Sequence, residues 1–564
     1  MSTHLPTAVS HEILADNFPC ILHLYLRCFT HMITLIIEAR IFQEAAASEF
    51  PRAVGATSVL ARLKQGTMSS FLRIEGTKIV NGDGEEVILR GAGLGGWMTM
   101  ENFITGFPGC EFQIREALVD VLGKEKSEFF FDKTRCTDSD RTATALQFLE
   151  HFFAEDDAAF FKSLGLNCIR IAINYRHFED DMHPRVLRPG CFTHLDRAVA
   201  ACAKHGIYTV LDMHTAPGGQ NGGWHCDAGT HIAGFWIHKD FQDRLVWLWM
   251  EIAQHYKDER WIAGYNVLNE PADPHHTGLV AFYDRAHAAI RSADQHHALF
   301  LDGNTYATDF AAFPADAHTR WPNAAYAIHD YSLYGFPSAP EPYARTEEQR
   351  RRMRRSYERK RAWMDARGLC VWNGEWGPVY ARREYDGEDT DAINERRYNV
   401  LSDQLDLYHK ASSPTLDRLS WSIWLYKDIG FQGMVHVAPA TPYMALFKDF
   451  LAKKHRLAAD AWGADDTYVR DVYEPLVRLI EENVPEDYRQ LYPYPVWTVE
   501  RRVARLARSM LVSEFLVREW AEHFRGMVEE ELERLAESFK FANCVERAGL
   551  NAVLRKHAEQ TGGA

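Results

Sequence analysis

Short apolar segments recur along the chain at long intervals, and this recurrence constrains the fold more than any other feature. Helix-like stretches, such as residues 195–206, 282–295 and 347–368, separate these segments from one another. Eight repeats of a strand followed by a helix are typical of an α/β fold, the (β/α)8 or TIM barrel. The eight predicted strands are residues 87–94, 167–173, 208–214, 262–270, 298–303, 325–331, 369–376 and 419–426.

Two further regions flank the predicted barrel. Residues 71–80 and 86–90 enclose a turn sequence, Asn-Gly-Asp-Gly at 81–84, which predicts an N-terminal β-hairpin. In the C-terminal region, apolar residues recur at spacings near three and four, which indicates amphipathic helices. These residues are Val503, Leu506, Met510, Phe515, Trp520, Leu532, Leu535 and Phe539. Because such stripes usually face a core, we expect a C-terminal helical extension packed on the barrel flank; a cap over the site or a self-association face is the alternative.

These patterns divide the chain into three parts. We expect residues 1–67 to be an unstructured or spurious extension, residues 68–455 to form the barrel, and residues 456–564 to form a helical region packed on it. The polar stretch 134–145 is predicted to be an exposed insertion. The apolar stretch 19–39 is interrupted by polar and charged residues and lacks a convincing cleavage pattern, so it predicts neither a membrane span nor a signal peptide. The expected location is therefore the cytoplasm.

Composition argues against several partners and cofactors. The formal net charge is −15 and no long basic run is present, which disfavours nucleic acid as a partner. The ten cysteines form no CxxC pair, so no zinc or redox motif is indicated and a reducing compartment is favoured. We expect no metal and no cofactor. The 15 tryptophans and 23 tyrosines suit sugar recognition by stacking, although aromatic residues more often fill cores.

Polar and aromatic residues gather where the predicted strands end. In a (β/α)8 barrel the catalytic groups lie at the carboxyl ends of the strands. Taken singly, a histidine or tryptophan at such a position is more often a core residue, and a glutamate is more often a solvated loop residue. Their recurrence on six strands predicts one shared site instead. The residues are Arg170, His214, Asn269, Glu270, His329, Tyr331, Glu375 and Trp424.

Two carboxylates at one barrel mouth favour glycoside hydrolysis. Glu270 and Glu375 end strands on opposite sides of the ring, where long inward side chains can reach the roughly 5–5.5 Å separation of retaining enzymes. Arg170, Tyr331 and His329 are possible neighbours of Glu375 that would keep it ionised as a nucleophile. The charge of Glu375 would in turn raise the pKa of Glu270, the expected acid. Two further roles are expected, a hydrogen bond from Asn269 to the sugar 2-hydroxyl and a stacking floor from Trp424.

The motifs around these residues resemble those of glycoside hydrolase family 5, which belongs to a large clan of retaining (β/α)8 enzymes. The resemblance covers roughly residues 70–450 and includes LRGAGLGGW at 89–97, GLNCIRIAI at 165–173, LDMHTAPGGQNGG at 211–223, NVLNEP at 266–271, HDY at 329–331, WNGEWG at 372–377 and WSIWLYKD at 421–428. It implies that Glu270 is the acid/base and Glu375 the nucleophile. It also implies that the other six strand-end residues bind substrate.

Two stretches are similar to the exo-β-1,3-glucanase and fungal glucosylceramidase-like branches of that family. They are residues 95–102 and the sequence APGGQNG at 216–222. The similarity implies exo-attack on a β-glucoside, a β-glucan or a glycolipid, as in glucan catabolism. It makes Glu101 a candidate for binding the terminal sugar, with Trp97, Trp224 and Asp227 as weaker candidates.

The C-terminal region departs from the lipid-glucoside branches. Those enzymes carry a C-terminal β-sandwich, whereas residues 456–564 have a helical pattern. A lipid aglycone or self-association through these helices therefore stays open. The alternatives for the activity are a β-mannosidase, an endo-β-glucanase and a carbohydrate-binding protein without catalysis.

Overall fold

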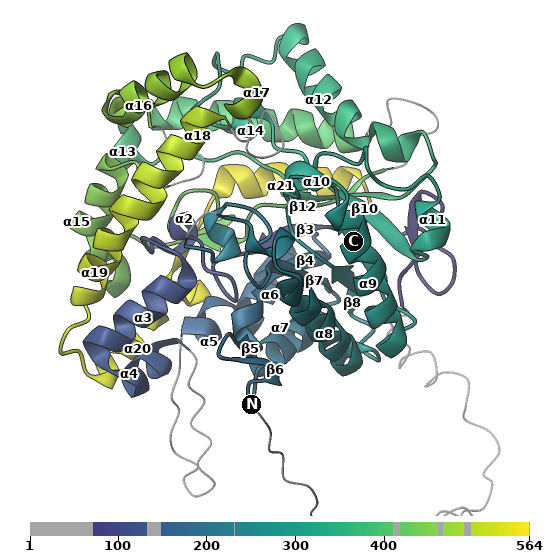
Figure 1. Ribbon diagram of the computed structural model, residues 1–564, viewed down its shortest axis with the longest axis horizontal. Helices are drawn as coiled ribbons and strands as arrows, with labels where there is room; N and C mark the ends of the chain where they lie inside the picture. The colour runs from purple at the N-terminus through teal and green to yellow at the C-terminus, as the bar shows by residue number, and fades with distance from the viewer. Residues whose placement is uncertain are drawn as a thin grey trace, which may run out of the picture. The chain divides into compact units, whose positions relative to one another are not determined.

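The computed structural model describes residues 71–131, 148–229, 232–409, 418–460, 466–489 and 498–562. Within these residues, eight parallel strands close into a barrel in the order in which they occur along the chain, as the prediction requires (Figure 1). The strands are β3 (Arg90–Leu94), β4 (Cys168–Asn174), β7 (Tyr208–Thr215), β8 (Ile262–Asn266), β9 (Ala298–Asp302), β10 (Ala324–His329), β11 (Val371–Glu375) and β12 (Ser420–Ile423). The expected extension and the polar insertion, residues 1–67 and 134–145, lie outside the described residues.

The fourth strand is shorter than predicted. The ladder of β8 ends at Asn266, whereas the sequence predicts a strand that continues to Glu270. The backbone of Glu270 has a left-handed φ of 45°, so a strand could not have continued through this residue. Asn269 and Glu270 are therefore positioned by a short segment that follows the strand.

Helices follow the strands along the chain and cover the outside of the barrel. The helix of residues 193–204 illustrates why they form: Leu195, Val199 and Cys202 are buried at spacings of three and four, which is the pattern of one helix face. The main helices are α6 (Glu155–Ser163), α7 (Thr193–Lys204), α8 (Lys239–Tyr256), α9 (Gly278–Ala293), α12 (Glu347–Asp365), α14 (Thr390–His409) and α15 (Pro442–Arg456). The three helical stretches predicted from the sequence, residues 195–206, 282–295 and 347–368, are confirmed as α7, α9 and α12.

The N-terminal hairpin closes the amino end of the barrel. Strands β1 (Arg73–Glu75) and β2 (Lys78–Val80) pair through a turn at 76–77, and the predicted turn at 81–84 forms as well. This second turn supports only one bridge, between Val80 and Glu86, so the hairpin is confirmed with an earlier turn than expected. Leu72 and Ile79 pack with the first residues of the barrel strands, which leaves the carboxyl end for the site.

The C-terminal helices pack against the helices of the barrel. Helix α19 (Ser513–Glu522) contacts α3 (Glu111–Leu122), and α20 (Glu529–Glu537) contacts α15. Helices α16 (Arg470–Asn483), α18 (Val499–Ala504) and α19 are the lime ribbons along one side of Figure 1. Strand β15 (Cys544–Glu546) pairs antiparallel with β14 (Val435–Val437). The remaining elements are a π-helix, η7 (Arg505–Val512), and α21 (Ala548–Gln560).

The predicted apolar face of these helices is partly wrong. Leu506 and Phe515 are 46% and 74% exposed, whereas Leu516 and Val517 are buried. The π-helix between residues 505 and 512 has a wider turn than an α-helix, so it shifts the direction of every side chain that follows. Residues chosen at spacings of three and four on both sides of this segment therefore lie on two different faces of the helix.

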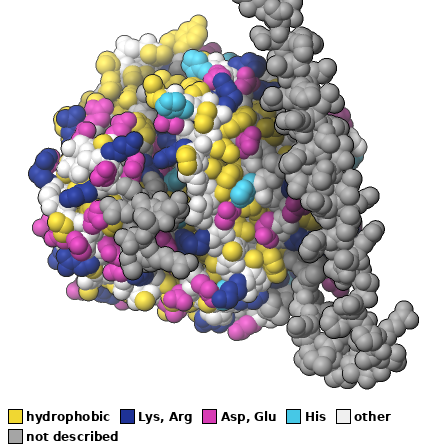
Figure 2. Space-filling model, turned by 90° about the horizontal axis from the view of Figure 1, so that it is seen from below, with side chains coloured by type: hydrophobic (Ala, Val, Ile, Leu, Met, Phe, Trp, Pro, Cys, Tyr) yellow, Lys and Arg dark blue, Asp and Glu magenta, His cyan; other side chains and the backbone are white. Residues whose placement is uncertain are grey.

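Two properties concern the described helices and one face of the surface. In the described ranges, no helix combines the length and apolar character required to cross a membrane. On the face shown in Figure 2, acidic and basic side chains are interspersed with one another.

Candidate active site

A cavity of about 750 Å³ lies at the carboxyl end of the barrel. Six of the eight predicted strand-end residues line it, both glutamates among them, and the other two, Arg170 and Asn269, are bonded to each other next to it. Its lining includes Glu101, His214, Trp224, His225, Glu270, Tyr306, His329, Tyr331, Phe336, Glu375, Trp424 and a group of C-terminal residues between 466 and 509. This position is the one that the barrel rule predicts.

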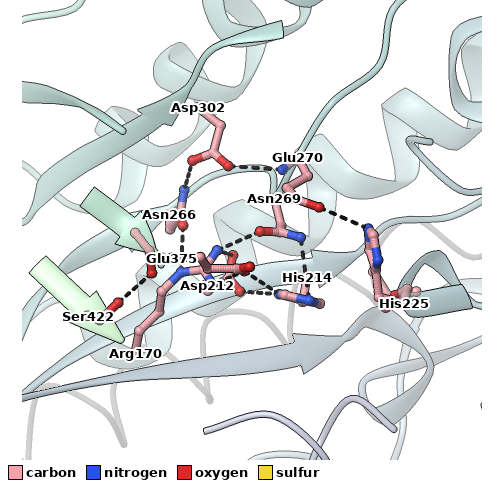
Figure 3. Close-up of polar contacts among 12 residues, drawn as sticks. Arg170, Asp212, His214, His225, Asn266, Asn269, Glu270, Asp302, Glu375 and Ser422 are labelled. Carbon is pink, nitrogen blue, oxygen red and sulfur yellow. Dashed lines mark hydrogen bonds and ion pairs between the residues drawn. The ribbon is translucent and has the colours of Figure 1, made fainter. Parts of the chain in front are cut away.

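Arg170 organises the floor of the cavity (Figure 3). It is fully buried on β4, where its Nη1 donates to Glu375 Oε1 at 2.6 Å and its Nη2 donates to Asn269 Oδ1 at 2.6 Å. The same guanidinium pairs with Asp212 Oδ1 at 3.0 Å and donates through Nε to Asn266 Oδ1 at 3.0 Å. One cation thereby holds Glu375 and Asn269 in a fixed relation.

Glu375 ends β11 and is held in its ionised form. Tyr331 donates its hydroxyl to Glu375 Oε2 at 2.9 Å. Burial acts to raise the pKa of Glu375, but the charges of His329, Arg170 and His214 outweigh burial and hold the pKa below its ordinary value. The predicted neighbours of this carboxylate are therefore the observed ones, and they favour an anion.

Glu270 is held by its backbone as well as its side chain. Its N–H donates to Asp302 Oδ2 at 2.9 Å, and its carbonyl accepts from Asn221 Nδ2 at 2.7 Å. These bonds offset the cost of its left-handed conformation, which is of order 1–3 kcal/mol for such residues. Its Oε1 lies 2.7 Å from His329 Nδ1. Backbone strain retained at this position is a feature of functional sites.

The two glutamates approach each other closely. One carboxylate oxygen of each, together with a ring nitrogen of His329, all lie within 4.8 Å of one another. Carboxylates about 5–5.5 Å apart can act on both sides of one anomeric carbon, whereas a separation of roughly 6.5–9.5 Å leaves room for a water. By spacing alone these three groups could also ligate a cation, as could His151, Glu533 and Glu537.

Trp424 and His214 form a flat layer beside the glutamates. Their rings are parallel, with centroids 5.1 Å apart and an interplanar angle of 2°. Two glycines of the LRGAGLGGW motif make room for the indole: a Cβ on Gly93 would lie 2.3 Å from it, and one on Gly95 would lie 2.6 Å away. Asp212 Oδ2 lies 2.7 Å from His214 Nδ1 and fixes the imidazole.

Of the four candidates for binding the terminal sugar, Glu101 and the weaker candidate Trp224 line the cavity. Glu101 is buried, and its Oε1 accepts no hydrogen bond from any residue that the structure describes. Burial, followed by the charges of Glu375 and Glu270, raises the pKa of Glu101. Trp224 presents its ring to the cavity while its Nε1 donates to Ser509 O at 3.2 Å.

The other two candidates lie elsewhere, contrary to expectation. Trp97 is fully buried in the core, where its Nε1 donates to Leu149 O at 2.6 Å. Asp227 accepts from the Phe112 N–H at 2.9 Å and pairs with Arg176 Nε at 2.7 Å. Both side chains are used to hold loops, so neither faces a substrate.

Several site residues were not predicted from the sequence. Asp212 and Asn266 bond Arg170, and Asp302 bonds both Glu270 and Asn266. The signal for Asp302 was present, because it ends the fifth strand as a polar residue. Asp212 could have been found by alternation, since it lies two residues before His214 and faces the same side of the strand.

The C-terminal region supplies one wall of the cavity. Arg505 of the π-helix donates to Gly222 O, and Ser509 accepts from Trp224. The sequence left open whether the C-terminal helices pack on the barrel flank or cap the site, and the structure shows that they do both. No local pattern predicts this contact, because it joins segments about 285 residues apart. The lining residues are Asp466, Arg470, Tyr473, Glu500, Arg501, Ala504, Arg505, Arg508 and Ser509.

Comparisons with known proteins show what this chain is similar to. The family model "Cellulase (glycosyl hydrolase family 5)" matches residues 137–426. A protein named β-xylosidase from Phanerodontia chrysosporium is 69% identical over 489 residues, which is 87% of this chain and 98% of that protein. A glucan 1,3-β-glucosidase from Candida oleophila is 32% identical over 36% of this chain and 48% of its own length. The crystal structure of endogalactoceramidase overlaps 63% of this chain and 74% of that chain at 19% identity, with a TM-score of 0.44. The chain therefore belongs to glycosyl hydrolase family 5.

Proposed function

We propose that this glycoside hydrolase is a retaining, exo-acting β-glycosidase that removes a terminal sugar by double displacement. The observation that carries the proposal is the close approach of Glu270 and Glu375, with one oxygen of each within 4.8 Å of the other. Such a separation suits a direct nucleophile rather than an intervening water.

In the first step Glu375 attacks the anomeric carbon and forms an ester, while Glu270 gives its proton to the departing oxygen. The Arg170 and Tyr331 bonds to Glu375 keep it ionised and aim it. In the second step Glu270 takes a proton from water, the hydroxide oxygen bonds to the anomeric carbon, and the ester bond breaks. Two displacements return the sugar with its original configuration.

The remaining residues support binding of the sugar. Asn269 Oδ1 accepts from Arg170 and its Nδ2 lies 3.4 Å from His214 Nε2. These contacts fix the amide next to Glu270, and its second N–H is the proposed donor to a sugar 2-hydroxyl. Trp424 supplies a stacking floor. The unsatisfied oxygen of Glu101 can accept from hydroxyls of a terminal sugar, which supports exo-action.

The relatives guide the choice of sugar. The name of the 69% identical relative supports a β-xyloside as the first substrate class. The name of the 32% identical relative supports a β-glucoside, which is also the expectation from the sequence. A β-mannoside or an internal glucan bond has weaker support.

A panel of aryl β-glycosides tests the proposal. The wild-type protein and Glu375→Gln are compared on xyloside, glucoside, mannoside and galactoside, and the first-formed anomer is identified by proton NMR. We expect release of a β-configured sugar and a loss of several orders of magnitude in kcat for the variant. Glu348→Gln, on the outer helix α12, is the matched control. Binding of sugars without hydrolysis by the wild type would favour the non-catalytic alternative, and an α-configured product would contradict retention.

A further inference from the structure

Two histidines share the carboxyl group of Glu270. His329 Nδ1 lies 2.7 Å from Oε1, and His225 Nε2 lies 3.6 Å from Oε2, so that the His225 ring lies beside this carboxyl group in Figure 3. Burial acts to lower the pKa of His329, but the charge of Glu375 and the bond to Glu270 raise it above its ordinary value, so Nδ1 donates to Oε1. A proton carried by Glu270 therefore belongs on Oε2, the oxygen that faces His225.

The amide of Asn221 fixes which nitrogen of His225 carries the ring proton. Its Oδ1 accepts from the Gly223 N–H at 2.7 Å, which makes Nδ2 the donor end of the amide. This Nδ2 donates to the Glu270 carbonyl at 2.7 Å and lies 2.8 Å from His225 Nε2. Because an amide nitrogen donates and does not accept, Nε2 is the acceptor and the ring proton lies on Nδ1.

The imidazole of His225 is neutral. Burial lowers the pKa of His225 to about 4, although the charge of Glu270 acts in the opposite direction. The contact with Glu270 Oε2 therefore joins a carboxyl oxygen to the unprotonated nitrogen of the ring, and it is not an ion pair. At 3.6 Å it is also longer than a hydrogen bond, so its influence is electrostatic.

A nitrogen in this position acts on the proton of the acid. The partial negative charge of Nε2 disfavours a full negative charge on Oε2 and thereby favours the protonated carboxyl group. In the proposed reaction this proton passes from Glu270 to the glycosidic oxygen, which also takes the electron pair of the bond to the anomeric carbon as that bond breaks. His225 lines the same cavity, beside the oxygen from which the proton departs.

We propose that His225 is a positioning residue for the acid: its neutral ring, oriented by Asn221, holds the proton of Glu270 on Oε2 until the leaving group takes it. The inference rests on the proposed function, because it takes Glu270 as the acid. His225 follows β7 in a short 3-10 helix, η2 (Trp224–Cys226), and belongs to none of the strand ends. Gly223 leaves room for the ring, since a Cβ there would lie 2.6 Å from His225 Cε1.

Glu270 has other titratable neighbours, which contribute to its behaviour with pH. Arg505 acts in addition on His225, where its charge helps to lower the pKa of the ring. All of these groups are the same when only residue 225 is changed, so differences among variants of this residue report on the ring. The neighbours of Glu270 are Glu101, His214, Cys226, Asp302, Tyr306, His329, Tyr331 and Glu375.

The test is a series of variants at residue 225, each measured as a pH profile of kcat/KM on an aryl β-glycoside. His225→Gln keeps an acceptor beside Oε2, His225→Phe keeps only the ring shape, and His225→Lys brings a cation. Since the alkaline limb reports loss of the acid's proton, we expect it to move to lower pH, by about half a pH unit in His225→Phe and by about one in His225→Lys. His225→Gln should stay near the wild type. The control is His183→Phe, at an exposed histidine of β6 (His183–Leu187), which should keep the wild-type limb.

A second readout uses the leaving group. The rate lost by His225→Phe should be larger for an alkyl β-glycoside, whose leaving group needs the proton, than for a dinitrophenyl β-glycoside, whose leaving group does not. A ring that only supports its loop would slow both substrates alike and leave the alkaline limb the same in all variants. That result, or a limb that moves to higher pH in His225→Phe, would overturn the inference.

Failure of the proposed function is recognised separately. It would appear as absence of hydrolysis by the wild type on every glycoside, or as wild-type hydrolysis of the alkyl glycoside by Glu270→Gln. Infrared difference spectroscopy then tests the ring without turnover, by following the protonated carboxyl band that is present in the wild type and absent from Glu270→Gln. A lower pH midpoint of that band in His225→Phe supports the role of the ring, and an equal or higher midpoint overturns it.

Discussion

His329 joins the two carboxylates of the site: its Nδ1 lies 2.7 Å from Glu270 Oε1 and 3.6 Å from Glu375 Oε2. Burial acts to lower the pKa of His329, but the charge of Glu375, the bond to Glu270 and the charge of Asp302 outweigh burial and raise it. A positive imidazole between the glutamates offsets their mutual repulsion and keeps them close.

Replacing His329 by Gln should therefore move the acidic limb of the kcat/KM profile to higher pH. Loss of the cation removes an influence that lowers the pKa of Glu375, so this carboxylate protonates at a higher pH and the nucleophile is lost earlier. A pH series on an aryl glycoside measures the shift, with the exposed His183→Gln as control. An unmoved or lowered limb would contradict the assignment.

Tyr331→Phe should reduce kcat by roughly tenfold or more with a smaller change in KM, since it removes one hydrogen bond to an ion. The lost donor lies 2.9 Å from Glu375 Oε2 and helps to fix the carboxylate. Steady-state kinetics check this result. A variant with wild-type kcat would show that the hydroxyl does not position the nucleophile.

Gly93→Ala should displace the indole of Trp424. The added Cβ would lie 2.3 Å from the ring, a distance that forces a shift and costs about 1–3 kcal/mol. We expect a raised KM and an altered tryptophan fluorescence spectrum. Gly387→Ala is the control, because a Cβ there meets nothing within 4 Å. The φ of 72° at Gly387 adds backbone strain to the control that Gly93→Ala does not have. Unchanged KM in Gly93→Ala would argue against Trp424 as the floor.

Lys427→Met should lower the free energy of unfolding by about 3–5 kcal/mol, because it leaves a buried carboxylate without its cation. Lys427 and Asp157 are both fully buried and lie 2.6 Å apart, and Lys427 also donates to Phe539 O of the C-terminal region. Denaturant unfolding gives the change. The double variant with Asp157→Leu should recover much of the loss; a single variant as stable as wild type would contradict the account.

Strand pattern and residue type together predicted most of this architecture. A buried strand must be apolar, so the polar residue that ends it stands out, and six strand ends converge on one point in a closed barrel. Arg170, Glu375 and His329 were therefore predictable as neighbours. Asp212 was missed, although its position two residues before His214 places both side chains on the same side of the strand.

Long-range packing could not be predicted in the same way. Arg505 reaches Gly222 because the π-helix continues into α19, and α19 packs against α3. The exposure of Phe515 shows the same limit, since a π-turn changes the phase of a helix without a marker in the sequence. Trp97 was misplaced because the resemblance of a motif does not state where its ring points.

The most direct test of the central claim is to trap the covalent intermediate. Incubation with a 2-deoxy-2-fluoro-β-xyloside that has a good leaving group, followed by peptide mass spectrometry, should find one sugar ester on Glu375 and none in Glu375→Gln. Labelling of another residue, or turnover of the natural β-glycoside with inversion and without any ester, would contradict the roles assigned to Glu270 and Glu375.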